Sequence, residues 1–478
     1  MAEPFKVIIV GGSIAGLTLA HCLHRANIEY IVLERKAEIA PQEGASIALW
    51  PTGGQVLDQL GLWEDISAGA DVIKQHNVLF PDGFAFTHFV LESLYERFGY
   101  GFVMVERQRL LECLYENSPN QTKIHVSKAV VEIQQTDAGV SVTTQDGAIY
   151  TGSLVVGADG VHSRVRSEMW RLAEAEAKNS GSSPPTIASE KETLRAEYSC
   201  VFGISTTIPG LRSREHDLVY GDGYVVLSFH NRQCVYWFVI HRMDRVYAYQ
   251  DVPRFTAEDA EDMCMRKYRD VRIADGVYVR HLWEYKKVAS MIAMEQGIFE
   301  TWGSGRIVLV GDAVRKMTVT LGQGANATIE DSAVLATLLD RLVHDTRAKA
   351  RETPTNEDIK ALFAEFREAR YARSHVIYKE TRLAGQFQTR KDLIKRVIGR
   401  YIMPYLTDYM ADGMSNLIAG GPVVGFLPLP ARRMDGWEKY SSRNASKRGG
   451  SSWVQWGVVS LSLVLLVSLL AKYRDAGR

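Results

Sequence analysis

The chain of 478 residues has no excess of charge of either sign and contains few cysteines. Lysine plus arginine and aspartate plus glutamate both number 56, so no basic surface for nucleic acid is predicted. The five cysteines include no Cys-x-x-Cys pair, which argues against a zinc site and a disulfide framework. The twelve histidines show no metal-ligand spacing. These absences favour a protein of a reducing compartment that binds neither nucleic acid nor metal.

One long hydrophobic run stands out near the C-terminus. Residues 453–471 are 19 residues without a charge, and as a helix they would span about 28 Å, close to the hydrocarbon thickness of a bilayer. Trp453 and Trp456 begin the run and Lys472-Tyr473-Arg474 follow it, as is typical of membrane interfaces. The sequence predicts a single-pass anchor in the endoplasmic reticulum membrane with a cytosolic catalytic domain. A buried helix of a globular domain is the alternative.

A glycine-rich turn directly follows the first apolar run, residues 5–10, which is predicted to be a strand and not a signal peptide. The turn reads Gly11-Gly12-Ser13-Ile14-Ala15-Gly16, and a helix, a second strand and Glu34 come after it. This order is typical of a dinucleotide-binding motif. Gly11 permits the tight turn, Gly16 permits close helix–strand contact, and Glu34 can accept hydrogen bonds from ribose hydroxyls. Ser13 replaces the second glycine of the motif, where a small residue is tolerable.

Two later segments place an aspartate at the end of an apolar strand. Residues 154–160 read LVVGADG and contain Asp159; an ordinary Asp-Gly turn is the alternative. Residues 311–332 read GDAVRKMTVTLGQGANATIEDS. Here Asp312 suits a hydroxyl of a ribityl or ribose chain, and the helix that begins after Gly324 suits an anion or an electron-rich ring. An ordinary strand–loop–helix connection is the alternative.

The region between these segments has a different composition. Residues 172–192 are polar and are predicted to form a surface insertion. Runs rich in Val, Tyr, Phe and Trp then predict strands of an antiparallel sheet, at residues 197–206, 223–230 and 234–241. Their aromatic residues are expected to be mainly core.

Together, the segments near residues 11, 157 and 311 resemble the three signatures of single-component FAD-dependent monooxygenases of the aromatic-hydroxylase type. The resemblance spans roughly residues 5–345. Within that superfamily, the chain is similar to the fungal paxilline- and meroterpenoid-type epoxidases of prenyl chains. This narrower likeness is carried by EGASIALWPTG at 43–53, VERQRLLECL at 105–114 and DAVRKMT at 312–318.

The resemblance implies an α/β fold with a Rossmann-like FAD-binding domain, an inserted antiparallel β-sheet domain, a C-terminal helical region and one C-terminal transmembrane helix. The expected parts are the FAD-binding domain at 1–170 and 300–345, the substrate-binding domain at 171–299, a helical cap at 346–440, a linker at 441–452 and the membrane helix at 453–471.

The resemblance also implies the site residues. The predicted FAD-binding residues are Gly11, Gly12, Ser13, Gly16, Glu34, Gly44, Ala48, Arg107, Asp159, Asp312, Gly324 and Ala325. Arg107 suits phosphate because a guanidinium can bind two of its oxygens at once. Arg195 and Tyr220 are the candidates for positioning substrate in catalysis; a surface arginine and a packed tyrosine are the alternatives. No metal ligand is predicted.

The implied reaction uses FAD, with NADPH and O2 as co-substrates, and passes through a flavin C4a-hydroperoxide that transfers its distal oxygen. The expected substrate is an apolar prenylated small molecule whose alkene is epoxidised. Arg315-Lys316 and Val319-Thr320 replace the His-Pro and Pro-Asn of many aromatic hydroxylases. The resemblance implies that these positions face the flavin and the substrate, so this departure favours an alkene over a phenol. An aromatic hydroxylase is the alternative enzyme. The alternative that is not an enzyme is a membrane-anchored protein that binds flavin without catalysis.

Overall fold

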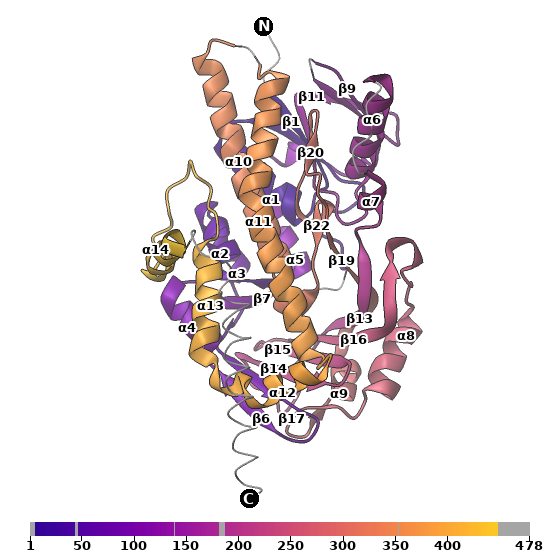
Figure 1. Ribbon diagram of the computed structural model, residues 1–478, viewed down its shortest axis with the longest axis vertical. Helices are drawn as coiled ribbons and strands as arrows, with labels where there is room; N and C mark the ends of the chain where they lie inside the picture. The colour runs from indigo at the N-terminus through magenta and orange to yellow at the C-terminus, as the bar shows by residue number, and fades with distance from the viewer. Residues whose placement is uncertain (1–4, 44–45, 138, 181–186, 352, 448–478) are drawn as a thin grey trace, which may run out of the picture.

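The computed structural model describes residues 5–43, 46–137, 139–180, 187–351 and 353–447. A six-stranded sheet at one end of the molecule and an eight-stranded sheet at the other form its framework (Figure 1). Helix α11 (Asn356–Gln388) is 33 residues long and runs along the molecule from the first sheet to the second.

The six-stranded sheet has β1 near its centre, parallel to β12 on one side and to β2 on the other. Its order is β20 (Gly303–Ser304), β21 (Ile307–Leu309), β12 (Leu154–Gly157), β1 (Lys6–Val10), β2 (Glu29–Leu33) and β8 (Ile124–His125). The β1 sequence, KVIIV, is almost wholly apolar, as is typical of a parallel strand that is covered on both faces.

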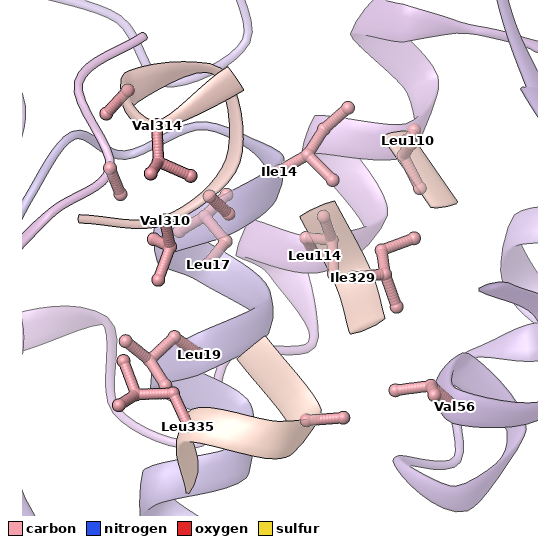
Figure 2. Packing of buried hydrophobic residues seen from close by; sticks show 14 of the residues in the cluster. Ile14, Leu17, Leu19, Val56, Leu110, Leu114, Val310, Val314, Ile329 and Leu335 are labelled. Atoms are coloured by element: carbon pink, nitrogen blue, oxygen red, sulfur yellow. The ribbon is translucent and has the colours of Figure 1, made fainter. Parts of the chain in front are cut away.

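Three helices pack together beside this sheet: α1 (Ile14–Arg25), α5 (Arg107–Glu116) and α10 (Gly324–Ala348). Figure 2 shows Leu17 and Leu19 of α1 in one apolar cluster with Leu114 of α5, Ile329 and Leu335 of α10, and Val310, which precedes α10. Because α1 and α10 each begin directly after a loop of the candidate site, this packing holds the two helix N-termini in fixed positions.

The eight-stranded sheet joins segments that are far apart in the sequence. Its order is β22 (Arg315–Lys316), β19 (Lys286–Ile298), β13 (Arg195–Ser205), β16 (Val235–Ala248), β15 (Tyr224–His230), β14 (Glu215–Gly221), β5 (Gln75–Leu79) and β6 (Ala85–His88). The predicted antiparallel strands are present, and the sheet also takes β5 and β6 from outside residues 171–299.

The two faces of the eight-stranded sheet have different neighbours, because successive side chains of a strand point to opposite faces. On one face, Val201, Val219 and Trp237 pack in a separate apolar cluster with α8 (Ala257–Asp262) and α9 (Val279–Glu284). The other face turns toward the six-stranded sheet and lines the cavity described below.

The remaining elements cover these sheets. A small sheet comprises β3 (Ser46–Leu49), β7 (Phe102–Glu106) and β4 (Val72–Ile73), and another comprises β9 (Val130–Gln135), β10 (Val140–Thr144) and β11 (Ile149–Gly152). A two-stranded ribbon pairs β17 (Arg272–Ala274) with β18 (Val277–Tyr278). The other helices are α2 (Pro51–Gln59), α3 (Trp63–Ser67), α4 (Val90–Phe98), α6 (Arg164–Ser180), α7 (Ile187–Lys191), α12 (Leu393–Tyr401), α13 (Thr407–Ala419) and α14 (Gly436–Lys447). The predicted surface insertion at 172–192 therefore contains helical segments.

The structure contradicts the part of the predicted fold class that added a membrane-spanning helix, and with it the predicted membrane location. Among the described residues, no helix combines the length and the apolar character that a bilayer crossing requires. Helices α10 and α11 are long, but charged residues recur along both of them. The run that prompted the prediction, residues 453–471, lies outside the described residues.

Candidate active site

A cavity of about 980 Å³ lies between the carboxyl ends of the parallel strands and the inner face of the eight-stranded sheet. Ligands of open α/β sheets bind at this position, outside the carboxyl ends of the strands. Of the residues predicted from the sequence, those that line the cavity are Gly11, Gly12, Ser13, Glu34, Ala48, Arg107, Asp159, Asp312, Gly324 and Ala325. The fold thus brings together residues from segments more than 300 positions apart.

The glycine-rich turn after β1 is tightly constrained by its neighbours. Gly11 has φ of +109°, and a Cβ there would lie 2.4 Å from the carbonyl oxygen of Ala158. A Cβ on Gly16 would lie 1.9 Å from the carbonyl oxygen of Gly11, so Gly16 does not line the cavity but allows α1 to pack against the turn. The carboxylate of Glu34 accepts hydrogen bonds from the backbone nitrogens of Gly12 at 2.7 Å and of Lys36 at 2.9 Å.

Arg107 is placed beside the N-terminus of α1. Its Nη2 donates to the Ser13 hydroxyl at 3.2 Å, whereas Nη1 is buried and has no hydrogen-bond partner among the described residues. The first turn of α1 contains no acidic residue, and Ser13 makes no side-chain capping bond. Free backbone N–H groups and an unsatisfied guanidinium nitrogen together form a site that suits a phosphate group.

Asp159 caps a helix. Its carboxylate accepts hydrogen bonds from the Ser163 hydroxyl at 2.6 Å and from the backbone nitrogens of Arg164 at 2.7 Å and Val165 at 3.1 Å, at the start of α6. Burial raises the pKa of Asp159, although these hydrogen bonds act in the opposite direction. The carboxylate therefore fixes the loop after β12 while one edge of the residue lines the cavity.

Arg166, also on α6, connects the segment at residues 154–160 with the segment at residues 311–332. It is buried, and it donates from Nη1 to the carbonyl oxygen of Ala313 at 2.7 Å and from Nη2 to that of Val161 at 2.8 Å. Its guanidinium carbon lies 4.0 Å from the centre of the Phe299 ring. These contacts hold the loop that carries Asp312 next to the loop that carries Asp159.

Asp312 lies in a short turn after β21, and its carboxylate forms an ion pair with Lys316 across the cavity lining. The loop then turns at Gly322, where φ is +59° and a Cβ would lie 2.5 Å from the Cβ of Ala48. A Cβ on Gly324, at the first position of α10, would meet no atom within 4 Å. The N-terminus of α10 therefore opens directly into the cavity, and its first turn contains no acidic residue.

Asn326 was not among the predicted site residues, but it connects the two loops at this end of the cavity. It is fully buried, and its Nδ2 donates to the carbonyl oxygens of Ala48 at 2.9 Å and Gly322 at 3.0 Å. Its Oδ1 accepts from the backbone nitrogen of Trp50 at 2.9 Å. The only sequence signal was the GQGAN motif itself, whose asparagine also forms a sequon.

Arg315 was expected to face the cavity, but its side chain does not line it. It is buried and pairs with Asp331 at 2.6 Å; Asp331 also pairs with Arg370 at 2.8 Å. Glu330 pairs with Arg370 and with Arg373, both at 2.7 Å. Burial alone would raise the pKa of Glu330, but Arg373 and Arg370 outweigh it and lower the pKa to about 2. The other three departures, Lys316, Val319 and Thr320, do line the cavity.

The two candidates for catalysis lie away from the cavity. Tyr220 is buried on β14 with its ring 5.8 Å from that of Phe80, and burial raises the pKa of its hydroxyl. Arg195 is the first residue of β13 and is exposed. The pattern of the sheet strands does not show which residues of a face reach the cavity. Gly44 lies outside the described residues.

The wall opposite the glycine-rich turn is mostly apolar. From the eight-stranded sheet it contains Phe202, Leu218, Phe229 and Phe238, and Phe102 and Met104 of β7 adjoin them. Two histidines, His76 and His216, are also part of this wall. No sequence pattern connects these two, because they become neighbours only where β5 pairs with β14.

The polar end of the cavity fits FAD. An unsatisfied arginine, a carboxylate beside the turn and two uncapped helix N-termini are the groups that a flavin dinucleotide requires. A sequence profile for the FAD binding domain matches residues 4–354. The chain is 46% identical to the FAD-dependent monooxygenase nvfK of Aspergillus novofumigatus, over 96% of each chain.

The chain belongs to the FAD-dependent monooxygenases. This monooxygenase is also 47% identical to the FAD-dependent monooxygenase penE of Penicillium thymicola, over 98% of this chain and 96% of penE. When bound, FAD supplies the electron transfer and the activation of O2, and the protein supplies orientation and a shielded site.

Solved structures share the fold. HpxO of Klebsiella pneumoniae, complexed with FAD and uric acid, superposes with a TM-score of 0.68 at 23% identity, over 87% of this chain and 97% of HpxO. CtdE, in complex with FAD and a substrate, superposes with a TM-score of 0.62 at 18% identity, over 81% of this chain and 90% of CtdE.

Proposed function

We propose that this FAD-dependent monooxygenase epoxidises an alkene of a farnesyl-type prenyl chain in the biosynthesis of a fungal meroterpenoid or indole diterpene. One atom of O2 enters the epoxide, the other is reduced to water, and NADPH is oxidised to NADP+. The observation that carries the proposal is the apolar wall of Phe202, Phe229 and Phe238, which lines the same cavity as the turn at Gly324.

An alkene offers no hydrogen-bonding group, so its recognition depends on shape and on burial of apolar surface. A wall of aromatic and aliphatic side chains supplies both. It also excludes water, which protects oxygen transfer from competing hydrolysis. The departures at Val319 and Thr320 place small side chains on this lining. The relatives named above come from fungi, which supports a role in fungal metabolism.

The roles of the cofactor-binding residues follow from their positions. Glu34 would bind the ribose of the adenosine, and Arg107 with the N-terminus of α1 would bind the pyrophosphate. Asp312 would bind the ribityl chain. Ala48 and Ala325 would lie beside the flavin ring, where the N-terminus of α10 stabilises negative charge.

Residues 1–170 and 300–345 would then form the FAD-binding domain, and residues 171–299 would form the substrate-binding domain together with β5 and β6. The helical region at 346–440 would cover both. NADPH would approach the flavin without a nucleotide-binding domain of its own.

An aromatic hydroxylase with the same cofactors is the second candidate. Phe229 and Phe238 favour it, because an aromatic substrate could stack on them as readily as a prenyl chain could pack there.

Oxidation of NADPH by the flavin-loaded protein tests both candidates. A farnesylated phenol and the same phenol without the prenyl chain serve as probes under ¹⁸O2. The epoxidase proposal expects faster NADPH oxidation and one ¹⁸O atom in the prenyl chain of the first probe alone. Incorporation of ¹⁸O into the ring of either probe would contradict it and favour the hydroxylase.

A further inference from the structure

Two histidines form a polar site within the apolar wall of the cavity. His76 of β5 and His216 of β14 face each other in the register of these parallel strands, and their ring centres are 4.7 Å apart. Both line the cavity. The Nε2 atoms of both rings have no hydrogen-bond partner among the described residues. A buried polar group without a partner costs about 1–3 kcal/mol of stability, so a ligand oxygen that hydrogen-bonds to either ring would recover that cost.

The surroundings keep both rings uncharged. Burial lowers the pKa of His76 to about 3, with a smaller effect of His88. Burial also lowers the pKa of His216 well below its usual range, assisted by His76 and His230. The two carboxylates on these strands, Glu215 and Asp217, point to the opposite face, where they accept hydrogen bonds from Asn77 at 3.1 and 2.8 Å. Each neutral imidazole has one N–H donor and one acceptor nitrogen, so the pair suits a hydroxyl or carbonyl oxygen better than a carboxylate.

A continuous row of aromatic rings connects this pair with the turn that would hold the flavin. Trp50, bound to Asn326 beside that turn, contacts Phe102 with ring centres 4.7 Å apart. Phe102 stacks on Phe229 at 5.8 Å, and Phe229 stacks on His216 at 3.8 Å. The histidine pair is therefore separated from the flavin end of the cavity by two phenylalanine rings. A molecule that contacts both ends must lie along those rings.

We propose that His76 and His216 bind a neutral oxygen-bearing group at one end of an otherwise apolar substrate and so determine which alkene of its chain reaches the flavin. This proposal rests on the proposed function for the reaction, but the binding it describes can be measured without turnover. The two residues are positioning residues, since they act on the end of the substrate that does not react.

The experiment measures binding to the FAD-loaded protein by calorimetry in the absence of NADPH. The probes are a farnesylated phenol and the corresponding farnesylbenzene, which lacks the hydroxyl group. His76→Phe and His216→Phe should each weaken binding of the phenol by at least about tenfold and leave that of farnesylbenzene within about twofold. His76→Gln, which retains a donor and an acceptor, should recover part of the loss. Equal weakening of both probes, or of neither, overturns the proposal.

His88→Phe is the matched control. His88 is buried, and its ring centre is 6.5 Å from that of His76. Its Nε2 has no partner within the described part of the chain, its Nδ1 hydrogen-bonds to the Thr407 hydroxyl at 2.5 Å, and it does not line the cavity. The control should bind both probes like the unaltered protein. If it loses affinity for the phenol as His76→Phe does, the effect is a general disturbance of the wall and the proposal fails.

Product analysis separates this proposal from the proposed function. If the unaltered protein binds the phenol more tightly than farnesylbenzene and the phenylalanine variants lose that preference, yet no epoxide forms, the histidine site stands and the epoxidase function fails. If epoxide forms at the same alkene with unchanged affinity in the unaltered protein and in both phenylalanine variants, the function stands and the histidine site fails.

Discussion

The side-chain oxygen of Asn326 accepts a hydrogen bond from the backbone nitrogen of Trp50 at 2.9 Å, across 276 positions of sequence. The same side chain donates to the carbonyl oxygens of Ala48 and Gly322. One amide thus holds the end of β3 against the first turn of α10. Because both segments line the cavity at the end proposed for the flavin ring, this contact sets the width of that end.

Replacement of Asn326 by Ala should therefore weaken FAD binding. It removes the Asn326 partner of one backbone N–H and two carbonyl oxygens, and each of these groups left unsatisfied costs about 1–3 kcal/mol. We expect FAD affinity to fall at least tenfold and the melting temperature to fall with it, as measured by flavin fluorescence titration and thermal unfolding. Asn326→Asp retains an acceptor for Trp50 but sets a buried carboxylate against the carbonyl oxygens of Ala48 and Gly322, so it should lose FAD affinity at least as strongly as Asn326→Ala. Full FAD retention in Asn326→Ala would contradict this role.

Gly16→Ala should prevent formation of the FAD site. Its Cβ would lie 1.9 Å from the carbonyl oxygen of Gly11, and this backbone atom cannot move without displacing β1. We expect poor soluble yield or a colourless protein, measured by flavin absorbance after purification. Gly413→Ala on α13 is the control, because a Cβ there meets nothing within 4 Å. It should retain FAD and gain up to about 1 kcal/mol of stability.

Arg107→Met should weaken FAD binding more than Arg107→Lys does. Methionine retains the aliphatic stem but removes the charge and the donors, whereas lysine restores one charge without the paired geometry of a guanidinium. We expect losses of about 100-fold and about tenfold, because hydrogen bonds to charged groups contribute about 1.5–3 kcal/mol. The measurement is the FAD affinity of both variants at increasing salt concentration. If the two variants bind FAD equally, the bidentate role of Arg107 is wrong.

The buried cluster around Glu330 should make stability depend on acidity. The folded-state pKa of Glu330 is about 2, below the ordinary 4.5, so its ionised form stabilises the fold. That contribution is complete above about pH 4.5 and is lost as the pH falls toward 2; it amounts to about 3 kcal/mol. Thermal unfolding of the unaltered protein and of Glu330→Gln should show a gap in melting temperature at pH 6 that narrows at pH 3. A constant gap would show that Glu330 is not ionised in the fold.

Local patterns predicted residues that the fold brings together at the polar end of the cavity, and their contacts with FAD stay a prediction. The sequence predicted an apolar strand, a glycine-containing loop and a helix in two places. The structure has β1 and α1 at the first and β21 and α10 at the second. Gly11 and Gly16 could be predicted because their constraints come from residues close in sequence or from the adjoining parallel strand. A short-range pattern specifies such a turn wherever it occurs.

Sequence patterns could not place a side chain whose contacts come from residues distant in the sequence. Arg315 was expected to face the flavin, but its buried partner Asp331 is on α10, and only the packing of α10 against α11 brings Arg370 to the same carboxylate. Tyr220 and Phe229 lie in neighbouring strands of similar composition, yet Phe229 lines the cavity and Tyr220 does not. The predicted membrane anchor rested on hydropathy and on the aromatic and basic residues that flank the run, and the described fold contains no helix that could cross a bilayer.

The sequence alone determined the FAD-binding elements and the monooxygenase family, because backbone turns and helix N-termini are encoded by residues close together in the chain. Only the tertiary structure decided which side chains form the wall of the cavity away from the proposed flavin end. The pairing of β5 with β14 places His76 beside His216, and Phe229 and Phe102 separate them from Trp50. The physical reason is that a cavity wall takes its side chains from one face of a sheet, and strand pairing depends on contacts between segments well over a hundred residues apart.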